Sequence, residues 1–409
     1  MSISSNAPIN NNKFKLKLES LRLKNFRAFK NAEIKSIPNY CVFVGANGVG
    51  KSTIFSVFEF LKDAMNNNVN VALGRLGGSR GFDEVRSRNS EGPIEIELKF
   101  RARERGPLTT YLLSINAMHG RAFVEREILK YRRGSKGQPW SFLDFSKGKG
   151  YAIANELEQV KNEKDLSREE QSLKSDDILA IKGLAQFQKF PAVMALGELI
   201  DNWHISDFHI SKARSTPEEN YAEHLDREGA NLPLVVQYLY KRGDGTFKNI
   251  LSMLSHRIPG VSNVDAKTTE EGRVLLKFQD GAFSDPFLSK FVSDGTIKML
   301  AYLVLLFDPK PHPLLCVEEP ENQLYVSLLE ELAEDFRQYA NRGGQVMVST
   351  HSPDFLNALK PEEVFLIVKK DGYSEIKCSA DNEQVVKYVN EGDKLGFLWK
   401  QGFLGDVDP

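Results

Sequence analysis

The alternation of apolar and polar residues in the first third of the chain predicts β-strands. Apolar and polar side chains alternate from Phe14 to Phe29, and the ranges 94–100 (IEIELKF) and 111–131 have a similar strand-like character. A period of two is the spacing of a strand with one buried face. Met118-His119-Gly120 divides the last range, so we expect a hairpin turn there. Tyr40 to Val44 is a short apolar run of the kind found in buried strands.

Other stretches have the apolar spacing of helices. They are Thr53 to Lys62, NLPLVVQYLY at 231–240, and IKMLAYLVLLF at 297–307. The range 151–200 contains ELEQVKNEKDLSREEQSLKSDD, which is polar and helix-prone but has no sustained apolar heptads. We therefore expect helices in this range, but no long coiled coil.

Composition limits the class of protein. The 409 residues carry a net charge of −1, with 41% hydrophobic and 27% charged residues, as in an ordinary soluble protein. No apolar run is long enough to span a membrane, and the polar N-terminus has no secretion signal. The three cysteines of the chain lie far apart, which is typical of a reduced cytoplasmic protein. Nucleic-acid binding would need a local basic patch, because the overall charge supplies none.

The segment VGANGVGKST at 44–53 is the first candidate for a ligand-binding motif. Residues Gly45 to Ser52 satisfy the G-x-x-x-x-G-K-[ST] phosphate-loop pattern, between a predicted strand and a predicted helix. In such a loop, backbone N–H groups surround phosphate oxygens, the lysine reaches the β and γ phosphates, and the serine hydroxyl binds Mg²⁺. The alternative is a glycine-rich turn. The sequence thus predicts nucleotide contacts from six residues: Asn47, Gly48, Gly50, Lys51, Ser52 and Thr53.

A second motif ends in two adjacent acids. The apolar run from Leu314 leads into Glu318 and Glu319, as in a buried strand that presents acids at its carboxyl end. Glu318 is suited to hold Mg²⁺ through water, and Glu319 to polarise the attacking water. The alternative is an exposed charged turn before a helix.

Two further segments complete the candidate site. The run from Gln345 ends in His351, just before a predicted helix cap, so His351 is expected to hydrogen-bond the γ-phosphate or the water. The alternative is a histidine in a capping turn. Ser293 and Gly295 stand at the start of another predicted helix and would form an anion-binding end, or alternatively a plain helix cap.

The order of these motifs resembles the ATPase heads of the ABC type found in RecF, SMC and double-strand-break repair ATPases. It is most similar to the compact bacterial AAA-family ATPases related to OLD proteins. The matching segments are LKNFRAFKNAEI, VGANGVGKST, VSDGT, LLCVEEPENQLY and VSTHSPDFL, with NLPLVV between them. By resemblance Arg27, in the first segment, also touches the nucleotide, and Lys51, Glu319 and His351 are catalytic.

The resemblance implies an α/β P-loop NTPase of the ABC/SMC-head type, with a mixed sheet, flanking helices and an inserted helical lobe. We expect the head to be formed by residues 1–100 and 285–409, and a β-hairpin and helical lobe by residues 101–284. In this superfamily, Ser293 and Gly295 of one subunit would face the nucleotide held by Lys51 of the other. The resemblance therefore implies a homodimer that uses ATP and Mg²⁺.

Function follows from the same resemblance. We expect an ATP-driven switch in anti-phage defence or genome maintenance that acts through a separate effector protein, such as a nuclease or toxin. About sixty residues follow His351, too few for the Toprim nuclease domain of the nuclease-bearing relatives.

The chain departs from the family pattern at two places. No glutamine lies between Lys51 and Gln138, so the Mg²⁺-sensing glutamine of many relatives is missing or replaced, and we expect its substitute within 77–85. Tyr325 stands where relatives usually carry an aspartate or histidine. This departure questions whether the loop signals across the dimer, as it does in those relatives.

Three other classes of protein share some of these features. A DNA-binding repair ATPase of the RecF type would use the basic segment KYRRGSKGQ at 130–138, with Arg101, Arg103 and Arg105, although charge runs are more often a solvated face. Transporter ATPases and small-molecule kinases fit the motif set less well. His204 and His209 lack a third metal ligand at helical spacing, so they are interpreted as packing or surface residues.

Overall fold

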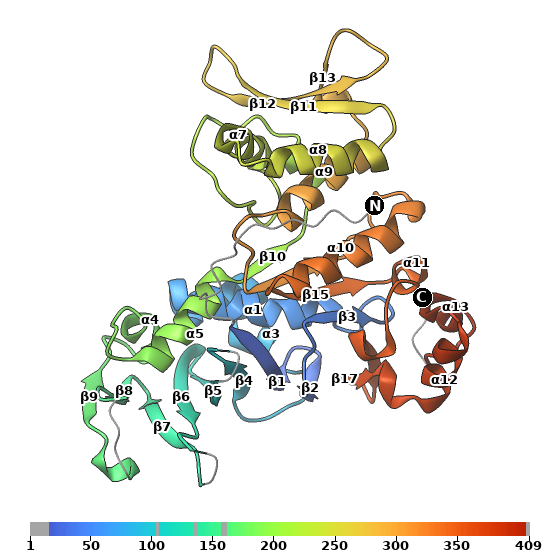
Figure 1. The fold of residues 1–409 in the computed structure, drawn as a ribbon. Coiled ribbons are helices and arrows are strands. Elements are labelled where there is room, and N and C mark those ends of the chain that lie inside the picture. Colours follow the sequence, from blue (N-terminus) through green and yellow to red (C-terminus); the bar gives the residue numbers. More distant parts are fainter. Residues whose placement is uncertain (1–15, 104–105, 135–136, 157–161, 406–409) are drawn as a thin grey trace.

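The structure is a computed structural model that describes residues 16–103, 106–134, 137–156 and 162–405. Two large sheets pack on opposite sides of a helical layer, and a smaller sheet lies at the far end of the molecule (Figure 1). Among these residues, no helix is long and apolar enough to cross a membrane.

The central sheet is six-stranded and mostly parallel. Every residue of β3 and β15 is buried, as expected for parallel strands that are covered on both faces. Only the edge pair β16–β17 is antiparallel. In spatial order the strands are β10 (His204–Ser206), β14 (Leu314–Glu318), β15 (Gln345–Thr350), β3 (Tyr40–Val44), β16 (Val364–Lys370) and β17 (Tyr373–Cys378).

The second sheet is eight-stranded and antiparallel. Buried and half-buried residues alternate strictly along β4, which explains the period of two in its sequence. The predicted hairpin turn is confirmed: His119 and Gly120 have positive φ values of 53° and 76° between β5 and β6. In spatial order the strands are β2 (Phe29–Ile34), β1 (Lys17–Phe26), β4 (Ile94–Arg101), β5 (Leu108–Met118), β6 (Arg121–Tyr131), β7 (Trp140–Ser146), β8 (Lys149–Ile153) and β9 (Arg168–Ser172).

The helices cover both faces of the central sheet. Alternate residues of β3 point to different cores: Cys41 and Phe43 face the core shared with the antiparallel sheet, and Val42 faces the other. The helices are α1 (Lys51–Asn66), α2 (Val69–Gly77), α3 (Phe82–Val85), α4 (Ala180–Leu184), α5 (Pro191–Asn202), α6 (Ile210–Ala213), α7 (Leu232–Arg242), α8 (Thr246–Arg257), α9 (Asp294–Leu306), α10 (Leu329–Asn341), α11 (Pro353–Leu356), α12 (Glu383–Glu391) and α13 (Leu395–Lys400).

A smaller part of the chain, residues 232–288, forms what we call the upper lobe (Figure 1). It contains α7 and α8, which pack against a three-stranded sheet. The strands are β11 (Val261–Thr268), β12 (Val274–Asp280) and β13 (Phe287–Leu288). Helix α9 begins beside this lobe and runs toward the central sheet (Figure 1).

The predicted helix at 53–62 lies within α1, the one at 231–240 corresponds to α7 from Leu232 onward, and the one at 297–307 corresponds to α9 up to Leu306. The helical prediction for 151–200 was wrong at Arg168–Ser172, which is strand β9. This strand pairs along one side only, at the end of the antiparallel sheet, so its polar residues stay solvated and leave no apolar alternation to read. Residues 157–161 of that range lie outside the described part of the chain.

The range 101–284, for which we expected an inserted lobe, is distributed over three places. It supplies β5–β9 to the antiparallel sheet, β10 to the central sheet, and the upper lobe. The expectation of no long coiled coil is confirmed for the described residues, whose longest helix, α1, has 16 residues.

Candidate ATP site

The phosphate loop joins β3 to α1 at the carboxyl edge of the central sheet. A Cβ atom on Gly45 would lie 2.5 Å from the carbonyl oxygen of Ile367, so only glycine fits against β16. Gly48 and Gly50 have φ values of 77° and 106°, in the region that favours glycine. No atom lies within 4 Å of a Cβ placed on Gly48, which leaves space above the loop for a ligand.

Lys51 is the first residue of α1 and is 6% exposed. Its Nζ donates to the carbonyl oxygens of Gly45 at 2.7 Å and Ala46 at 3.2 Å, so the side chain folds back over the loop. Burial lowers the pKa of Lys51, and the nearby carboxylates of Glu319 and Glu321 oppose this effect. No side chain caps the start of α1, so N–H groups of the first turn are available to an anion.

Strand pairing brings the acid pair to this loop. Glu318 on β14 pairs with Ser349 on β15, and Thr350 pairs with Val44 on β3. Burial raises the pKa of Glu318, and a hydrogen bond from Ser52 lowers it. The two residues expected to serve Mg²⁺ therefore touch each other, and their oxygens match the preference of that ion.

Glu319 has a positive φ of 40°, which is uncommon for a residue with a side chain. Its backbone N–H donates to Ser349 O at 2.9 Å, and its Oε2 accepts from Asn322 Nδ2 at 3.0 Å. These bonds fix the backbone and the carboxylate. Its Oε1 lies 3.7 Å from Nδ1 of His351.

Glu321 is an addition that sequence reasoning missed. Its Oε1 accepts from Thr350 Oγ1 at 2.8 Å and from His351 N at 2.7 Å, and it lies 3.1 Å from His351 Nδ1. Glu321 Oε2 and His351 Nδ1 are buried and have no hydrogen-bond partner. Such atoms are costly unless a ligand satisfies them, so the site suits a polar ligand.

Ser293 lies elsewhere, at the start of α9. It caps this helix by accepting from Thr296 N at 3.3 Å, and its Oγ lies 2.8 Å from Thr296 Oγ1. A Cβ on Gly295 would lie 3.1 Å from Gln323 O, so the helix start packs on the loop that follows the acid pair. Ser293 thus caps α9 and is exposed at the helix end, and its contact with the nucleotide of a second subunit stays a prediction.

Beside Ser293 is a hollow of about 650 Å³. Phe291 and Tyr325 line it and are 71% and 63% exposed. None of its lining residues belongs to the phosphate loop, the acid pair or the strand that ends at His351. The chain thus carries two separate parts of a candidate site.

Comparison with known proteins agrees with a nucleotide-binding site of this kind. A sequence model of the family described as "AAA domain, putative AbiEii toxin, Type IV TA system" matches residues 41–357. The chain belongs to this AAA-domain family. No curated protein sequence matches it.

Solved structures of SMC heads share the fold of this AAA-domain chain. An SMC head bound to the C-terminal winged-helix domain of ScpA has a TM-score of 0.54 at 15% identity, and the alignment covers 88% of this chain and 97% of that one. An SMC head from Pyrococcus furiosus, with an extended coiled coil and a bound ScpA domain, has a TM-score of 0.55 at 12% identity, covering 92% and 100%. The predicted resemblance and fold class are confirmed: the chain is an AAA-domain protein with the fold of SMC heads.

Two more charged residues of the AAA-domain chain lie near the acids of the candidate site and were not predicted from the sequence. Asp207 follows β10, whose Ser206 pairs with Val317, and its charge adds to the effect that raises the pKa of Glu318. Lys298, on α9, is 3% exposed, and burial lowers its pKa to about 8 against the pull of nearby carboxylates, Glu321 first. Lys298 thus places a buried amino group on the helix of Ser293 within the electrostatic influence of the acids. Neither position has a local sequence signal, because both depend on long-range pairing.

Arg27 lies below the phosphate loop. Its guanidinium donates to Ser56 Oγ at 3.2 Å and to Leu76 O at 2.8 Å, and Ser56 Oγ donates to Ser52 O at 2.8 Å. Its backbone N–H donates to Val85 O at 2.7 Å. The segment 77–85, where we expected the substitute for the missing glutamine, therefore borders Arg27. Nucleotide contact by either stays a prediction.

Two of the basic residues considered for DNA binding are engaged within the protein. Arg101 pairs with Glu19 at 3.2 Å, and Arg133 donates to Glu156 O and lies 5.5 Å over the ring of Trp140. Arg105 and residues 135–136 of the basic segment lie outside the described residues.

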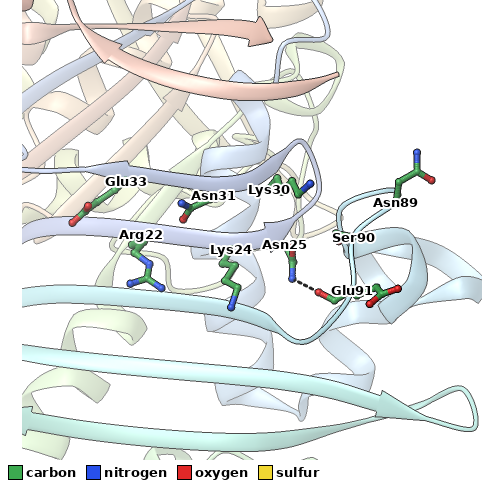
Figure 2. A pocket seen from close by; sticks show the side chains of 9 residues that line it. All are labelled: Arg22, Lys24, Asn25, Lys30, Asn31, Glu33, Asn89, Ser90 and Glu91. Carbon is green, nitrogen blue, oxygen red and sulfur yellow. Dashed lines mark hydrogen bonds between the residues drawn. The ribbon is translucent and has the colours of Figure 1, made fainter. Parts of the chain in front are cut away.

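A hollow on the outer face of β1 and β2 is also charge-balanced (Figure 2). It has a volume of about 680 Å³. Arg22 and Lys24 both pair with Glu95, at 3.4 and 2.9 Å. Asn25 Nδ2 donates to Glu91 O at 2.9 Å at its edge (Figure 2). These acids offset the basic side chains, so the hollow offers no strongly positive surface.

Proposed function

We propose that the chain is an ATP-binding and ATP-hydrolysing switch that works as a homodimer in the cytoplasm and acts on a separate effector protein. The main support is that the phosphate-loop part of the site and the start of α9 lie in different regions of the chain. Lys51, Glu319 and His351 lie at neighbouring strand ends. Ser293 borders a hollow that none of these three residues lines. Two copies would complete both sites.

The phosphate-loop part fits ATP and Mg²⁺. The open space above Gly48 and the uncapped start of α1 suit phosphate oxygens. Lys51 would exchange its contacts with loop carbonyls for phosphate oxygens, and Ser52 and Glu318 would hold the ion. Bound Mg²⁺ would neutralise charge on the phosphates.

The catalytic roles follow from the hydrogen bonds of the acids. Glu319, fixed by Asn322 at 3.0 Å, would accept a proton from the attacking water. Glu321 fixes the backbone of His351 at 2.7 Å, so that the imidazole can hydrogen-bond the γ-phosphate or the water. Glu321 acts through His351 and is a positioning residue.

The Ser293 surface has the properties of an interface between subunits. Phe291, Tyr325 and Val326 are 71%, 63% and 60% exposed, and the first two line the hollow. Monomers rarely expose clustered large apolar side chains, and such patches mark interaction sites. A second subunit that covers them would exclude water from the γ-phosphate and bring the start of α9 to it. Tyr325, the departure from the family pattern, would then lie in the interface.

Two comparisons support a separate effector. Both solved SMC heads carry a bound ScpA domain, so heads of this fold can hold a partner protein. The matching family description names a toxin–antitoxin system. We therefore place the switch in anti-phage defence or genome maintenance, with a nuclease or toxin as the class of effector.

The alternative, a DNA-binding repair ATPase of the RecF type, would require an exposed basic surface. Of the arginines considered for DNA binding, Arg101 and Arg133 are engaged by neighbours, which favours the effector proposal. Binding of duplex DNA that weakens steeply as salt rises would favour the alternative instead.

The proposal is tested by measuring mass and turnover together. Light scattering of Glu319→Gln with ATP should show a dimer, and with ADP a monomer. The specific ATPase activity of the unmutated protein should fall on dilution. A protein that is monomeric with ATP, and whose specific activity is unchanged on dilution, would contradict the shared site. Capture of partner proteins by Glu319→Gln with ATP, compared with ADP, then tests for the effector.

A further inference from the structure

A cluster of metal-binding side chains lies away from the ATP site. It contains His224, in the loop between α6 and α7, with Asp308 and His312, in the connection from α9 to β14. His312 stands two residues before β14, whereas Glu318 ends that strand. The cluster is therefore at the opposite edge of the central sheet from the phosphate loop.

The three side chains are already close together. One potential ligand atom from each lies within 4.8 Å of the others. His224 Nδ1 is 2.5 Å from Asp308 Oδ2, and the rings of His224 and His312 have centroids 5.0 Å apart. Asp308 is 6% exposed, and its other oxygen, Oδ1, accepts from Lys310 N at 2.7 Å. That bond orients the carboxylate and leaves Oδ2 directed to the histidines.

The hydrogen bonding of His312 prepares one ring nitrogen for a ligand. Its Nδ1 lies 3.0 Å from the carbonyl oxygen of Asn202. A carbonyl can only accept, so Nδ1 carries the proton and Nε2 has a free lone pair. Nε2 is buried and has no hydrogen-bond partner. A histidine that donates from one nitrogen to a backbone carbonyl and offers the other is the usual arrangement around protein-bound metals.

His204, the first residue of β10, adjoins the cluster. Its ring stacks on that of His312, with centroids 4.7 Å apart and planes 16° from parallel. Its Nε2 is also buried without a hydrogen-bond partner. Two such nitrogens side by side are unusual for a protein interior, where buried polar atoms are normally paired.

We propose that His224, Asp308 and His312 bind a divalent transition-metal ion, with Zn²⁺ as the best fit. Two imidazole nitrogens and one carboxylate oxygen are a common zinc ligand set. Ligand atoms at about 2.0–2.2 Å from a tetrahedral ion lie about 3.3 Å apart, so modest side-chain rotations would close the site. Water or His204 would take the fourth position. A magnesium or calcium site is disfavoured, because those ions prefer oxygen ligands.

The ion would connect three segments that are distant in sequence. Asp308 follows the end of α9, the helix that begins beside Ser293, and His312 precedes the strand that carries Glu318. Asn231, just before α7, donates from Nδ2 to His224 O at 2.9 Å, which ties the third segment to the upper lobe. The metal would therefore hold the upper lobe and α9 against the edge of the central sheet. This role is structural and does not depend on the proposed function.

The experiment uses untagged full-length protein. After chelator treatment and dialysis, the protein is titrated with Zn²⁺ in excess Mg²⁺, bound zinc is measured by mass spectrometry, and Tm is recorded. We expect one equivalent of zinc and a Tm increase of a few degrees. Co²⁺ in place of Zn²⁺ should give the visible absorption of a tetrahedral site, a signal that reports coordination rather than stability.

The variants His312→Ala and Asp308→Asn should each reduce zinc affinity at least tenfold and remove the Co²⁺ spectrum. His256→Ala, an exposed position on α8, is the matched control and should bind like the unmutated protein. His312→Gln replaces the alanine variant if that one does not fold. Absence of zinc binding in the unmutated protein, or equal binding in all variants, would overturn the proposal.

Discussion

The carboxylate of Glu321 fixes the position of His351. Its Oε1 accepts the backbone N–H of His351 at 2.7 Å and lies 3.1 Å from the imidazole Nδ1. The same oxygen accepts from Thr350 Oγ1 at 2.8 Å, so one atom organises the end of β15. A histidine held in this way has its imidazole placed before the nucleotide arrives, which is the preorganisation that catalysis requires.

Loss of this carboxylate should slow turnover more than binding. We expect Glu321→Ala to lower kcat by about 10- to 100-fold, the range for displaced catalytic groups, with a smaller change in KM. Glu321→Gln keeps an acceptor oxygen and should recover part of the loss. Glu330→Gln, on α10 at a surface ion pair with Lys394, is the control and should keep full activity. Equal losses in kcat for the alanine and glutamine variants, without a change in KM, would mean that His351 is not positioned by this hydrogen bond.

Lys51 and Glu319 should separate binding from chemistry. Lys51→Ala removes the buried cation of the loop and should abolish nucleotide binding, as measured by calorimetry. Glu319→Gln keeps the contact with Asn322 through its amide oxygen but cannot accept a proton. It should bind ATP normally, and its turnover should be slower by roughly a hundredfold or more. Turnover at the unmutated rate in Glu319→Gln would remove this residue from the mechanism.

The buried carboxyl of Glu127 should make stability depend on pH. Burial raises its pKa to about 7, although it accepts from Ala180 N at 2.6 Å, Ile181 N at 3.1 Å and Tyr111 OH at 3.1 Å. Between the unfolded value of 4.5 and about 7 the folded state holds more protons, so stability falls as pH rises through this window and then levels. The total loss is on the order of 3 kcal/mol.

Denaturant unfolding from pH 5 to 8 tests this dependence. The free-energy difference between the unmutated protein and Glu127→Gln should shift in favour of the glutamine variant as pH rises to 7. Glu125→Gln, two residues away on the same strand and half-buried, should run parallel to the unmutated protein. A Glu127→Gln curve that also runs parallel would show that Glu127 is ionised throughout.

The sequence predicted the parts of the site that local motifs define. Lys51, Glu319 and His351 each follow a short apolar strand, so their approach required only that these strands be parallel neighbours. Asp207 was missed because β10 has only three residues and joins β14, more than a hundred residues away.

The metal-binding cluster was missed for a related reason. His204 was considered together with His209, for a third ligand at helical spacing, whereas its neighbours His224 and His312 come from separate loops. Strand β9 was misread because an exposed edge strand need not alternate. Contacts between residues distant in sequence, and the position of a strand at the edge of a sheet, leave no local pattern in the sequence.

The start of α9 should face the nucleotide of a second subunit. Ser293 caps its own helix and borders a hollow that contains no phosphate-loop residue. If a second subunit places this helix over the nucleotide, an arginine at Ser293 would bring excess volume and charge into the contact without touching the phosphate loop of its own chain. Ser293→Arg should therefore bind ATP almost normally, remain monomeric with ATP, and lose most of its turnover.

Mixing variants separates a shared site from a helix cap. In a heterodimer of Ser293→Arg with Lys51→Ala, one site combines both defects, and the other joins an intact Lys51 to an intact Ser293. Turnover should then reappear in the mixture, at no more than one working site per heterodimer, although each variant alone is inactive. Ser293→Ala is the companion control, since loss of the cap costs about 1 kcal/mol without adding bulk. If Ser293→Arg and Ser293→Ala were equally active as monomers, and mixing with Lys51→Ala restored nothing, Ser293 would serve only its own helix and hydrolysis would need one subunit.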